Sequence, residues 1–308
     1  MSSWAWSLLL PLVALAAGFI PVFFCIFYWQ HLLSKEVRQS PLTRDMLRSP
    51  GDSLRTKIDD LQGTVNAAMA AWMILPALIC ISHLVDSHYR DTPETWTRVI
   101  SEFAVLSAGS LLIGRWMFKR FEELRRFHLG MQGELATGQE LDQLMLEGCR
   151  VYHDIPIAHG NIDHVVVSRS GVFTVNTKMR GKPQQGPGRA NVKVDYTRNK
   201  LQFPDYSFPI PNEQLQGEAN WLSKRLSGAM GESIKAAPIL AFPGWFIEER
   251  IGRGDVCIIN PTNAKKFFVN SRNVFSDTQI SQIAHHLEQL CRDVRPGFQN
   301  NTRWEDKR

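Results

Sequence analysis

The first 34 residues of this 308-residue chain contain no Asp, Glu, Lys or Arg. Residues 8–28 are almost entirely apolar, which is long enough to cross a hydrocarbon core of roughly 30 Å at about 1.5 Å per residue. The positively charged start of a cleaved signal peptide is also missing. Instead, aromatic residues typical of membrane interfaces flank the run: Trp4, Trp6, Tyr28 and Trp29. The absence of charge therefore predicts a retained membrane helix over about residues 5–30.

The chain is also poor in cysteine patterns. Its five cysteines are scattered, and no CxxC or Cys/His metal spacing occurs. This excludes a disulfide scaffold and a zinc site and fits a reducing cytosol. The adjacent His285 and His286 fall in an expected helix near the C-terminus and are interpreted as surface residues.

Two further apolar segments follow. Residues 65–85 are uncharged throughout, and their Pro76 is tolerable in a membrane helix if a neighbouring helix satisfies the freed carbonyl. Residues 99–118 carry Glu102 and Arg115 near their ends, where such side chains can reach the membrane interface. A re-entrant or interfacial helix is the alternative for this third segment.

The Lys and Arg distribution predicts the orientation. Six basic residues lie between the first and second apolar segments, only two between the second and third, and four directly after the third. Three spans with the N-terminus outside place both basic stretches in the cytoplasm, whereas two spans would send the large domain outside. We therefore expect a protein of the bacterial inner membrane. Its all-α transmembrane region would cover residues 1–118, its cytoplasmic domain residues 119–296 and its polar tail residues 297–308.

All of the net charge of +5 lies after the membrane region. Residues 1–118 contain nine basic and nine acidic residues, whereas residues 119–308 contain 26 and 21. Within residues 164–204, eight basic residues stand against one acid. Such a patch indicates a polyanion, either nucleic acid or an anionic lipid surface, with a solvated loop as the alternative. The candidate nucleic-acid-binding residues are Arg169, Arg180, Lys182, Arg189 and Lys193.

Hydrophobic periodicity and turn residues in the second part of the chain predict an α/β domain. A β-hairpin is expected from two β-branched runs joined at Arg169-Ser170-Gly171. A mobile loop is expected after the hairpin, over residues 182–189. The remaining expected elements are helices over 130–146, 212–230 and 277–290 and strands over 150–157, 162–168, 172–178, 237–242, 256–259 and 267–269.

The hairpin brings an acid and a lysine together. With a two-residue or four-residue loop about Ser170, Asp163 faces either Asn176 or Lys178 across the ladder. Asn176 and Lys178 are two residues apart, so they point to the same side of a regular strand. A carboxylate and an ammonium group are therefore expected to converge.

Several motifs occur in an informative order: Gly130-x-x-Gly133-Glu134 opening a helix, Asn161-Ile162-Asp163-His164 starting a strand, Lys178 ending the next strand with Gly181 after it, and Gln214 near the start of a later helix. In this order and spacing, residues 129–228 resemble the nuclease-related domain (NERD) family, a branch of the restriction-endonuclease-like PD-(D/E)xK superfamily. The resemblance implies a restriction-endonuclease-like mixed sheet flanked by helices. It also implies a hydrolase acting on nucleic acid.

The resemblance implies roles for individual residues. Asp163 would be the principal ligand of a divalent metal, Mg²⁺ or Mn²⁺, with Glu134 as a further acid. Lys178 would orient or activate the attacking water, and Gln214 would support Lys178 or a phosphate. The chain departs from the family at Asn176, where the pattern has Glu, and a neutral amide is a poorer ligand for a hard cation. Glu134 or the backbone carbonyl of Thr177 is expected to compensate.

Each of these residues also has a structural interpretation. Glu134 can favour the positive end of a helix dipole, Asp163 can stabilise the start of the hairpin, and Lys178 can be a solvated charge at a strand end. His153 and His164 lie in expected strands and are interpreted as structural. The joint occurrence of the acids and the lysine beside the basic segment favours the functional interpretation.

Three hypotheses follow. The first is a membrane-anchored, metal-dependent endonuclease that hydrolyses DNA at the cytoplasmic face. The second is a catalytically degenerate DNA-binding membrane tether, because Asn176 replaces the family Glu. The third is a membrane interaction protein that binds anionic lipid. The expected partners are DNA and membrane lipid, and the sequence leaves RNA as a substrate and a homo-oligomer open.

Overall fold

The computed structural model describes Phe24, Tyr28 and residues 42–89, 96–158, 160–186, 189–269 and 273–296. The chain forms two compact units, and each is described by itself. The first apolar segment, apart from Phe24 and Tyr28, and the polar tail lie outside the described residues. Unit 1 comprises Met1–Thr43, Gln62–Phe121 and Gly297–Arg308, and unit 2 comprises Arg44–Leu61 and Glu122–Pro296.

The second and third apolar segments are helical. They belong to α2 (Asp52–Tyr89) and α3 (Trp96–Asp142). Within unit 1 the two helices touch, since a Cβ on Gly109 would lie 2.6 Å from the ring of Trp72. No helix in the described part of the chain combines the length and the apolar character required to cross a membrane.

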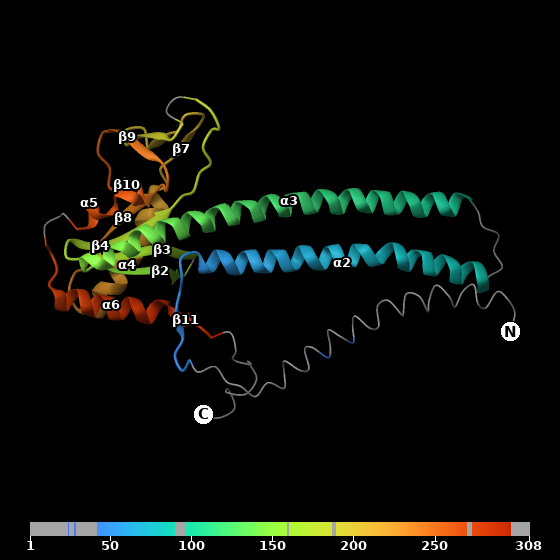
Figure 1. Cartoon of the computed structure of the whole chain (residues 1–308), viewed down its shortest axis with the longest axis horizontal. Coiled ribbons are helices and arrows are strands. Elements are labelled where there is room, and N and C mark those ends of the chain that lie inside the picture. The colour runs from blue at the N-terminus through green and yellow to red at the C-terminus, as the bar shows by residue number, and fades with distance from the viewer. Residues whose placement is uncertain are drawn as a thin grey trace. The chain divides into compact units, whose positions relative to one another are not determined.

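Unit 2 is built on a mixed five-stranded sheet with the order β10-β8-β4-β3-β2. The first three strands along the chain are antiparallel neighbours, whereas β8 and β10 run parallel to β4 and to each other (Figure 1). The β3–β4 hairpin has the two-residue turn Arg169-Ser170, one of the two expected loops. The strands are β2 (Arg150–Ile157), β3 (Gly160–Ser168), β4 (Gly171–Thr177), β8 (Ala236–Ala241) and β10 (Cys257–Ile259).

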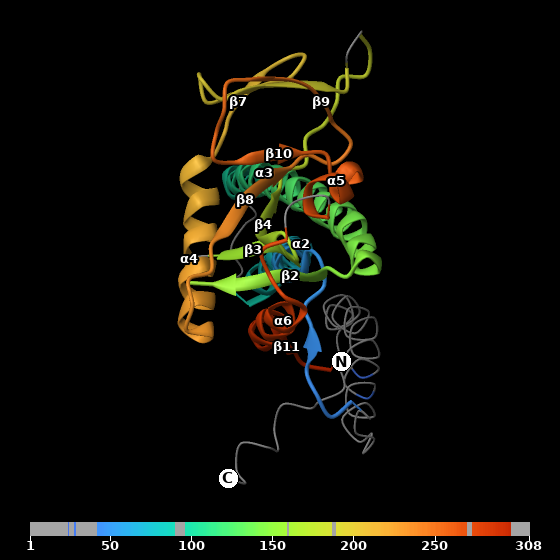
Figure 2. The ribbon, with the colours of Figure 1, turned by 90° about the vertical axis from the view of Figure 1, so that its left-hand side faces the viewer.

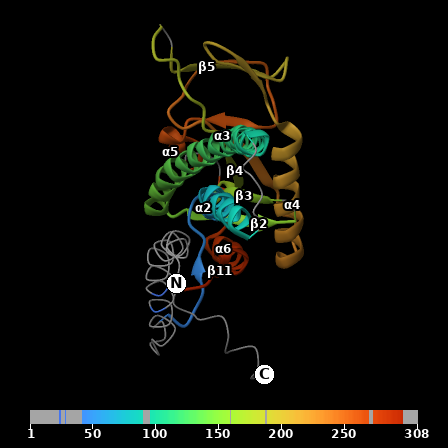
Figure 3. The ribbon, with the colours of Figure 1, turned by 90° about the vertical axis from the view of Figure 1, so that its right-hand side faces the viewer.

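Helices cover both faces of this sheet, which confirms the expected mixed α/β architecture. One face buries Val165, Val167 and Val172 against α4 (Asn212–Met230) and α6 (Asp277–Cys291). The other face packs against the end of α3, η1 (Gln143–Glu147) and α5 (Ala264–Phe268). Figures 2 and 3 show α4 on one side of the sheet and α5 on the other.

A second sheet, with the order β7-β6-β5-β9, was not expected from the sequence. Its buried face joins an aromatic core in which the Phe203 and Trp245 rings meet edge to face at 4.8 Å. Short strands with irregular patterns explain why propensity did not detect it. The strands are β5 (Asn191–Asp195), β6 (Lys200–Gln202), β7 (Ser207–Pro209) and β9 (Phe246–Ile251).

The segment Arg44–Leu61, which precedes the second apolar segment, is part of unit 2. Its strand β1 (Met46–Leu47) pairs with β11 (Arg292–Val294) near the end of the domain. Arg48 then forms a bidentate ion pair with Asp293, with both N–O distances at 2.7 Å. Unit 2 therefore includes a segment that precedes residues Gln62–Phe121 of unit 1 in the chain.

Two sequence expectations were wrong. No helix begins at Gly130, because α3 runs without a break from Trp96 to Asp142 and then continues as η1. Residues 267–269 are not a strand, because they form the last two residues of the short helix α5 and its C-cap, Val269. Both errors arise because a local pattern is ambiguous when its packing partner is unknown. A glycine can lie inside a helix as well as at its start, and a short apolar run can be a helix or a strand.

Candidate functional site

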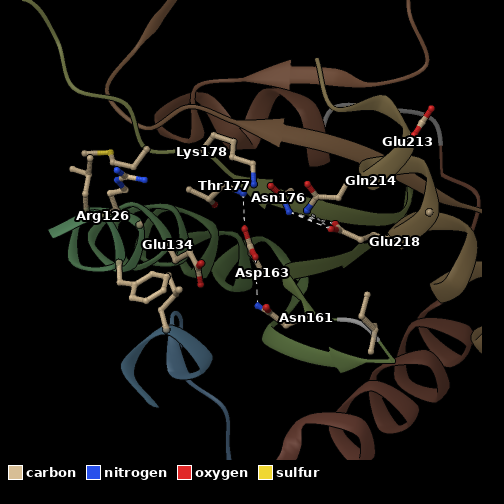
Figure 4. A pocket seen from close by; sticks show the side chains of 18 of the residues that line it. Arg126, Glu134, Asn161, Asp163, Asn176, Thr177, Lys178, Glu213, Gln214 and Glu218 are labelled. Carbon is tan, nitrogen blue, oxygen red and sulfur yellow. Dashed lines mark hydrogen bonds between the residues drawn. The ribbon is translucent and has the colours of Figure 1, made fainter. Parts of the chain in front are cut away.

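A pocket of about 800 Å³ lies at the end of the β3–β4 hairpin that is remote from its turn. Asp163 and Lys178 both line it, and Figure 4 shows their side chains directed toward each other. Glu134 reaches the pocket from α3, Gln214 from α4 and Asn176 from β4. The structure therefore brings together the four residues that the sequence selected for catalysis, with Asn176 beside them.

The ladder fixes the position of Asp163. The turn pairs Ser168 with Gly171, so the same register sets Asp163 opposite Asn176. The backbone N–H of Thr177 donates to Asp163 Oδ2 at 2.7 Å. Burial raises the pKa of Asp163, and this hydrogen bond and the charge of Lys178 oppose that effect.

A second carboxylate, Asp154, interrupts the β2–β3 ladder opposite Asp163 and has a left-handed backbone with φ of 52°. It is fully buried, and it accepts hydrogen bonds from Arg48 at 3.0 Å, Ser53 Oγ at 2.6 Å and Asn161 at 2.7 Å. Asn161 Nδ2 also lies 3.5 Å from Asp163 Oδ1. Asp154 is thus saturated with donors and holds the Arg44–Leu61 segment in place, whereas Asp163 keeps capacity for a ligand.

Glu134 lies in the last third of α3, not at a helix start. Its side chain is 7% exposed, and Oε2 has no hydrogen-bond partner within the part of the chain that the structure describes. Burial raises the pKa of Glu134, and the charges of Asp163 and Asp154 raise it further. The adjacent Gly133 allows this approach, because a Cβ there would lie 2.6 Å from Cβ of Met179.

Sequence reasoning missed Glu218 of α4. This carboxylate is 5% exposed, lines the same pocket and accepts a hydrogen bond from Gln214 Nε2 at 2.8 Å and from Asn176 Nδ2 at 3.3 Å. Gln214 thus contacts Glu218 in this structure, whereas the expectation was support of Lys178 or of a phosphate. Burial raises the pKa of Glu218 to about 7, and the charge of Asp163 contributes. The four-residue spacing from Gln214 was the available signal, because it places both side chains on one helix face.

Two buried histidines lie behind the site. The Nδ1 atoms of His153 and His164 are 2.9 Å apart, and their Nε2 atoms contact Asp142 at 3.0 Å and Thr177 Oγ1 at 3.2 Å respectively. Burial lowers the pKa of His164, and the neighbouring His153 adds to this effect. Both ring nitrogens of each histidine are occupied by protein partners, which agrees with a structural role.

Of the five predicted nucleic-acid-binding residues, Arg180 is the one that lines this pocket. Its guanidinium lies 4.4 Å from the ring centroid of Phe208. Lys182 follows two residues later, with its ammonium 5.8 Å from the Trp245 ring. These two cations therefore extend from the pocket toward the second sheet.

The structure does not bring the other three predicted basic residues to the pocket. Arg169 lies at the hairpin turn and pairs with Asp277 through two hydrogen bonds of 3.0 and 2.9 Å. Lys193 pairs with Glu249 at 3.3 Å on the second sheet. Arg189 donates to a carbonyl of its own loop.

Among the residues that the structure describes, no three His, Cys, Asp or Glu side chains are grouped so that they could hold a metal ion. The candidate ligands are therefore a mixed set, in which the carboxylates of Asp163 and Glu134 stand beside the amide oxygen of Asn176. The Oδ1 atom of Asn176 is buried and, within the described ranges, has no hydrogen-bond donor. Unsatisfied buried oxygens in a polar pocket require an explanation.

Residues 129–243 match the family model of the nuclease-related domain. The chain carries a NERD domain. No curated protein and no solved structure matches the chain. The NERD match covers α3 from Leu129, the hairpin, the second sheet up to β7, α4 and β8, and so contains every pocket residue discussed above except those of the Arg44–Leu61 segment. The match of this domain indicates a nuclease-like function and a nucleic acid partner.

Proposed function

We propose that the chain is a membrane-anchored, metal-dependent nuclease that hydrolyses DNA phosphodiester bonds at the cytoplasmic face of a bacterial membrane. The observation that carries the proposal is the convergence of Asp163 and Lys178 in one pocket of a NERD domain. Hydrolysis of a phosphodiester requires an activated water and neutralisation of the charge that develops on phosphorus oxygens. A carboxylate, an ammonium and a guanidinium around one pocket meet these requirements.

The oxygen atoms of the pocket fit a hard divalent cation. Asp163 would hold Mg²⁺ or Mn²⁺ together with Glu134, whose Oε2 lacks a donor in the described structure, as does Oδ1 of Asn176. Mg²⁺ is commonly held by one or two protein carboxylates together with phosphate oxygens and water, so a cluster of three acids is not required. When bound, the cation would lower the pKa of water and offset phosphate charge.

Lys178 and Arg180 would act on the phosphate and on the water. The backbone N–H of Lys178 donates to the carbonyl of Ala241 on β8 at 2.9 Å, which fixes the point where its side chain leaves the sheet. From there its ammonium can orient the attacking water beside Asp163. Arg180 can hold a neighbouring phosphate oxygen through its planar guanidinium.

Exposed apolar side chains in unit 1 support the membrane part of the proposal. Met73 of α2 and Leu111, Leu112 and Phe103 of α3 are each between 68% and 76% exposed. Large exposed apolar surfaces are unusual in water and commonly mark a membrane or protein contact. Membrane lipid is the occupant that the uncharged segments of the sequence predict.

Asn176 supports a second candidate function, in which the domain binds DNA without cutting it. The strand position that carries Glu in the family is a neutral amide here, so the site has one negative charge fewer. Weaker cation binding would then remove catalysis while leaving the basic residues. The chain would tether nucleic acid to the membrane.

Cleavage assays on the full-length chain in detergent test the two functions. Plasmid DNA is incubated with Mg²⁺ or Mn²⁺ and with the wild type, Asp163→Asn, Lys178→Ala or the control Glu248→Gln, an exposed glutamate of β9. We expect nicking by the wild type and the control and its loss in the other two. Equal nicking by Asp163→Asn and the wild type would reject the nuclease assignment. If Asn176→Glu nicks the plasmid and the wild type does not, the wild-type domain is a tether that binds DNA without cutting it.

A further inference from the structure

Glu218 is a buried acid without a basic partner in the described structure. It lies on the second turn of α4, and its contacts are to two neutral amides, those of Gln214 and Asn176. None of the ion pairs within the described residues includes it. Buried carboxylates are normally paired with a cation or coordinate a metal. Burial raises the pKa of Glu218 and the charge of Lys178 lowers it, but the two side chains form no ion pair, so Glu218 keeps free capacity for a further cation.

A purely structural clamp between α4 and the sheet does not explain this arrangement. A glutamine at 218 could accept the hydrogen bonds from Gln214 and Asn176 through its amide oxygen, without the cost of a buried charge. The clamp also leaves the Oδ1 atom of Asn176 without a donor in the described part of the chain, although Asn176 is 2% exposed. Both observations are accounted for if oxygen atoms of the two side chains face a cation.

The geometry relates Glu218 to the missing carboxylate of β4. Asn176 lies opposite Asp163 in the hairpin register, and its Nδ2 contacts both carboxylate oxygens of Glu218 at 3.3 and 3.5 Å. Glu218 thus lies one short side chain away from the strand position where the family pattern has Glu. In Figure 4 its carboxylate lies beside the amide group of Asn176, whereas Glu213 of the same helix points away.

We propose that Glu218 supplies to the divalent-cation site, from helix α4, the carboxylate that strand β4 lacks at Asn176. Asn176 and Gln214 are positioning residues that hold this carboxylate through their amide groups. The proposal rests on the proposed nuclease function and specifies how this chain completes the site. It also makes Asn176 a compatible residue instead of a defect.

Direct Mn²⁺ binding tests this assignment independently of cleavage. The full-length chain in detergent is titrated with Mn²⁺ by calorimetry, and Glu218→Gln is compared with the wild type and with the control Glu248→Gln, an exposed glutamate of β9 outside the pocket. Loss of a ligand carboxylate is expected to weaken Mn²⁺ affinity at least about tenfold, whereas the control stays within about twofold. Wild-type affinity in Glu218→Gln, or no Mn²⁺ binding by the wild type, overturns the proposal.

A transposition variant separates a ligand role from a packing role. In Asn176→Glu/Glu218→Gln the carboxylate moves to the strand, and the hydrogen bond between the two side chains persists with donor and acceptor exchanged. We expect Mn²⁺ affinity to return to within about threefold of the wild type, and thermal unfolding confirms that each variant is folded. Failure of the double variant to exceed Glu218→Gln contradicts the proposal. If Asp163→Asn loses Mn²⁺ binding and cleavage but Glu218→Gln keeps both, the ligand role of Glu218 is rejected and the proposed nuclease function is retained.

Discussion

The two ends of the β3–β4 hairpin differ in how their polar groups are satisfied. At the turn, the Oγ atoms of Ser168 and Ser170 are 2.7 Å apart, Ser170 Oγ donates to the carbonyl of Phe268, and Arg169 is paired with Asp277. Every one of these groups has a protein partner. Their arrangement satisfies the polar groups that the turn exposes, which is the usual requirement for stability.

At the opposite end, oxygen atoms gather with too few donors. Glu134 and Glu218 are each buried within reach of the charge of Asp163, and oxygens of Glu134 and Asn176 lack donors among the described residues. Such an arrangement costs folding free energy, because charges are removed from water without full compensation. The contrast indicates that the turn end serves stability and the open end serves binding.

The largest expected effect that follows from this contrast belongs to Asp163→Asn. Removal of the principal carboxylate should lower the DNA cleavage rate at least about 100-fold, because the stabilisation of developing charge is lost. The free energy of unfolding of the same variant should be unchanged or increased by up to about 1 kcal/mol, because an incompletely paired buried charge is removed. Single-turnover cleavage and chemical unfolding measure the two quantities. A loss of stability together with activity would contradict the division between the two ends.

Asp154→Ala should have the opposite profile. Asp154 lies beside Asp163 but accepts hydrogen bonds from Arg48, Ser53 and Asn161, so truncation leaves buried donors without an acceptor. We expect a loss of about 3 kcal/mol in the free energy of unfolding. Urea unfolding in detergent measures it, and Asp205→Ala, an exposed aspartate next to β7, provides the matched control. An unchanged unfolding midpoint would show that the Arg44–Leu61 segment is not held by this network.

The hairpin and its acid–lysine pair could be predicted from the sequence because they depend on local information. β-Branched runs and a short turn set the register, and the register sets which side chains share a side. The convergence of Asp163 with Lys178 followed from that alone. Hydrophobic periodicity predicted an α/β domain in the same way, whereas the mixed sheet flanked by helices was expected from the resemblance to the NERD family.

Glu218 and the Arg44–Leu61 segment could not be predicted because they depend on distant contacts. Nothing local shows that a glutamate on α4 meets Asn176, 42 residues earlier, or that Arg48 meets Asp293. The Gly133 motif was found, but it was assigned to a helix start. Its actual cause is the close approach of α3 to Met179, which only the tertiary structure reveals.

The pH dependence of stability should distinguish Glu218 from a satisfied acid. Burial raises the pKa of Glu218 from 4.5 to about 7, so the metal-free folded state binds more protons than the unfolded state between these values. The free energy of unfolding should therefore fall as pH rises from about 4.5 to about 7, by on the order of 2 kcal/mol. Glu218→Gln should remove this part of the slope, and urea unfolding at several pH values measures it. Parallel curves for the two proteins would refute the interpretation.

Arg169→Ala should have the smallest effect, although sequence charge alone marks Arg169 as a DNA-binding residue. Its ion pair with Asp277 joins side chains that are 60% and 75% exposed, and exposed pairs of this kind contribute about 0.5 kcal/mol or less. The turn also lies roughly 20 Å from Asp163, the length of six residues of strand.

We therefore expect Arg169→Ala to change stability and DNA affinity only slightly, whereas Arg180→Ala at the pocket weakens DNA binding severalfold and reduces its salt dependence. Fluorescence anisotropy with labelled duplex DNA over a NaCl series compares the two. Equal losses in both variants would mean that DNA contacts the whole length of the hairpin, and the functional contrast between its ends would then be wrong.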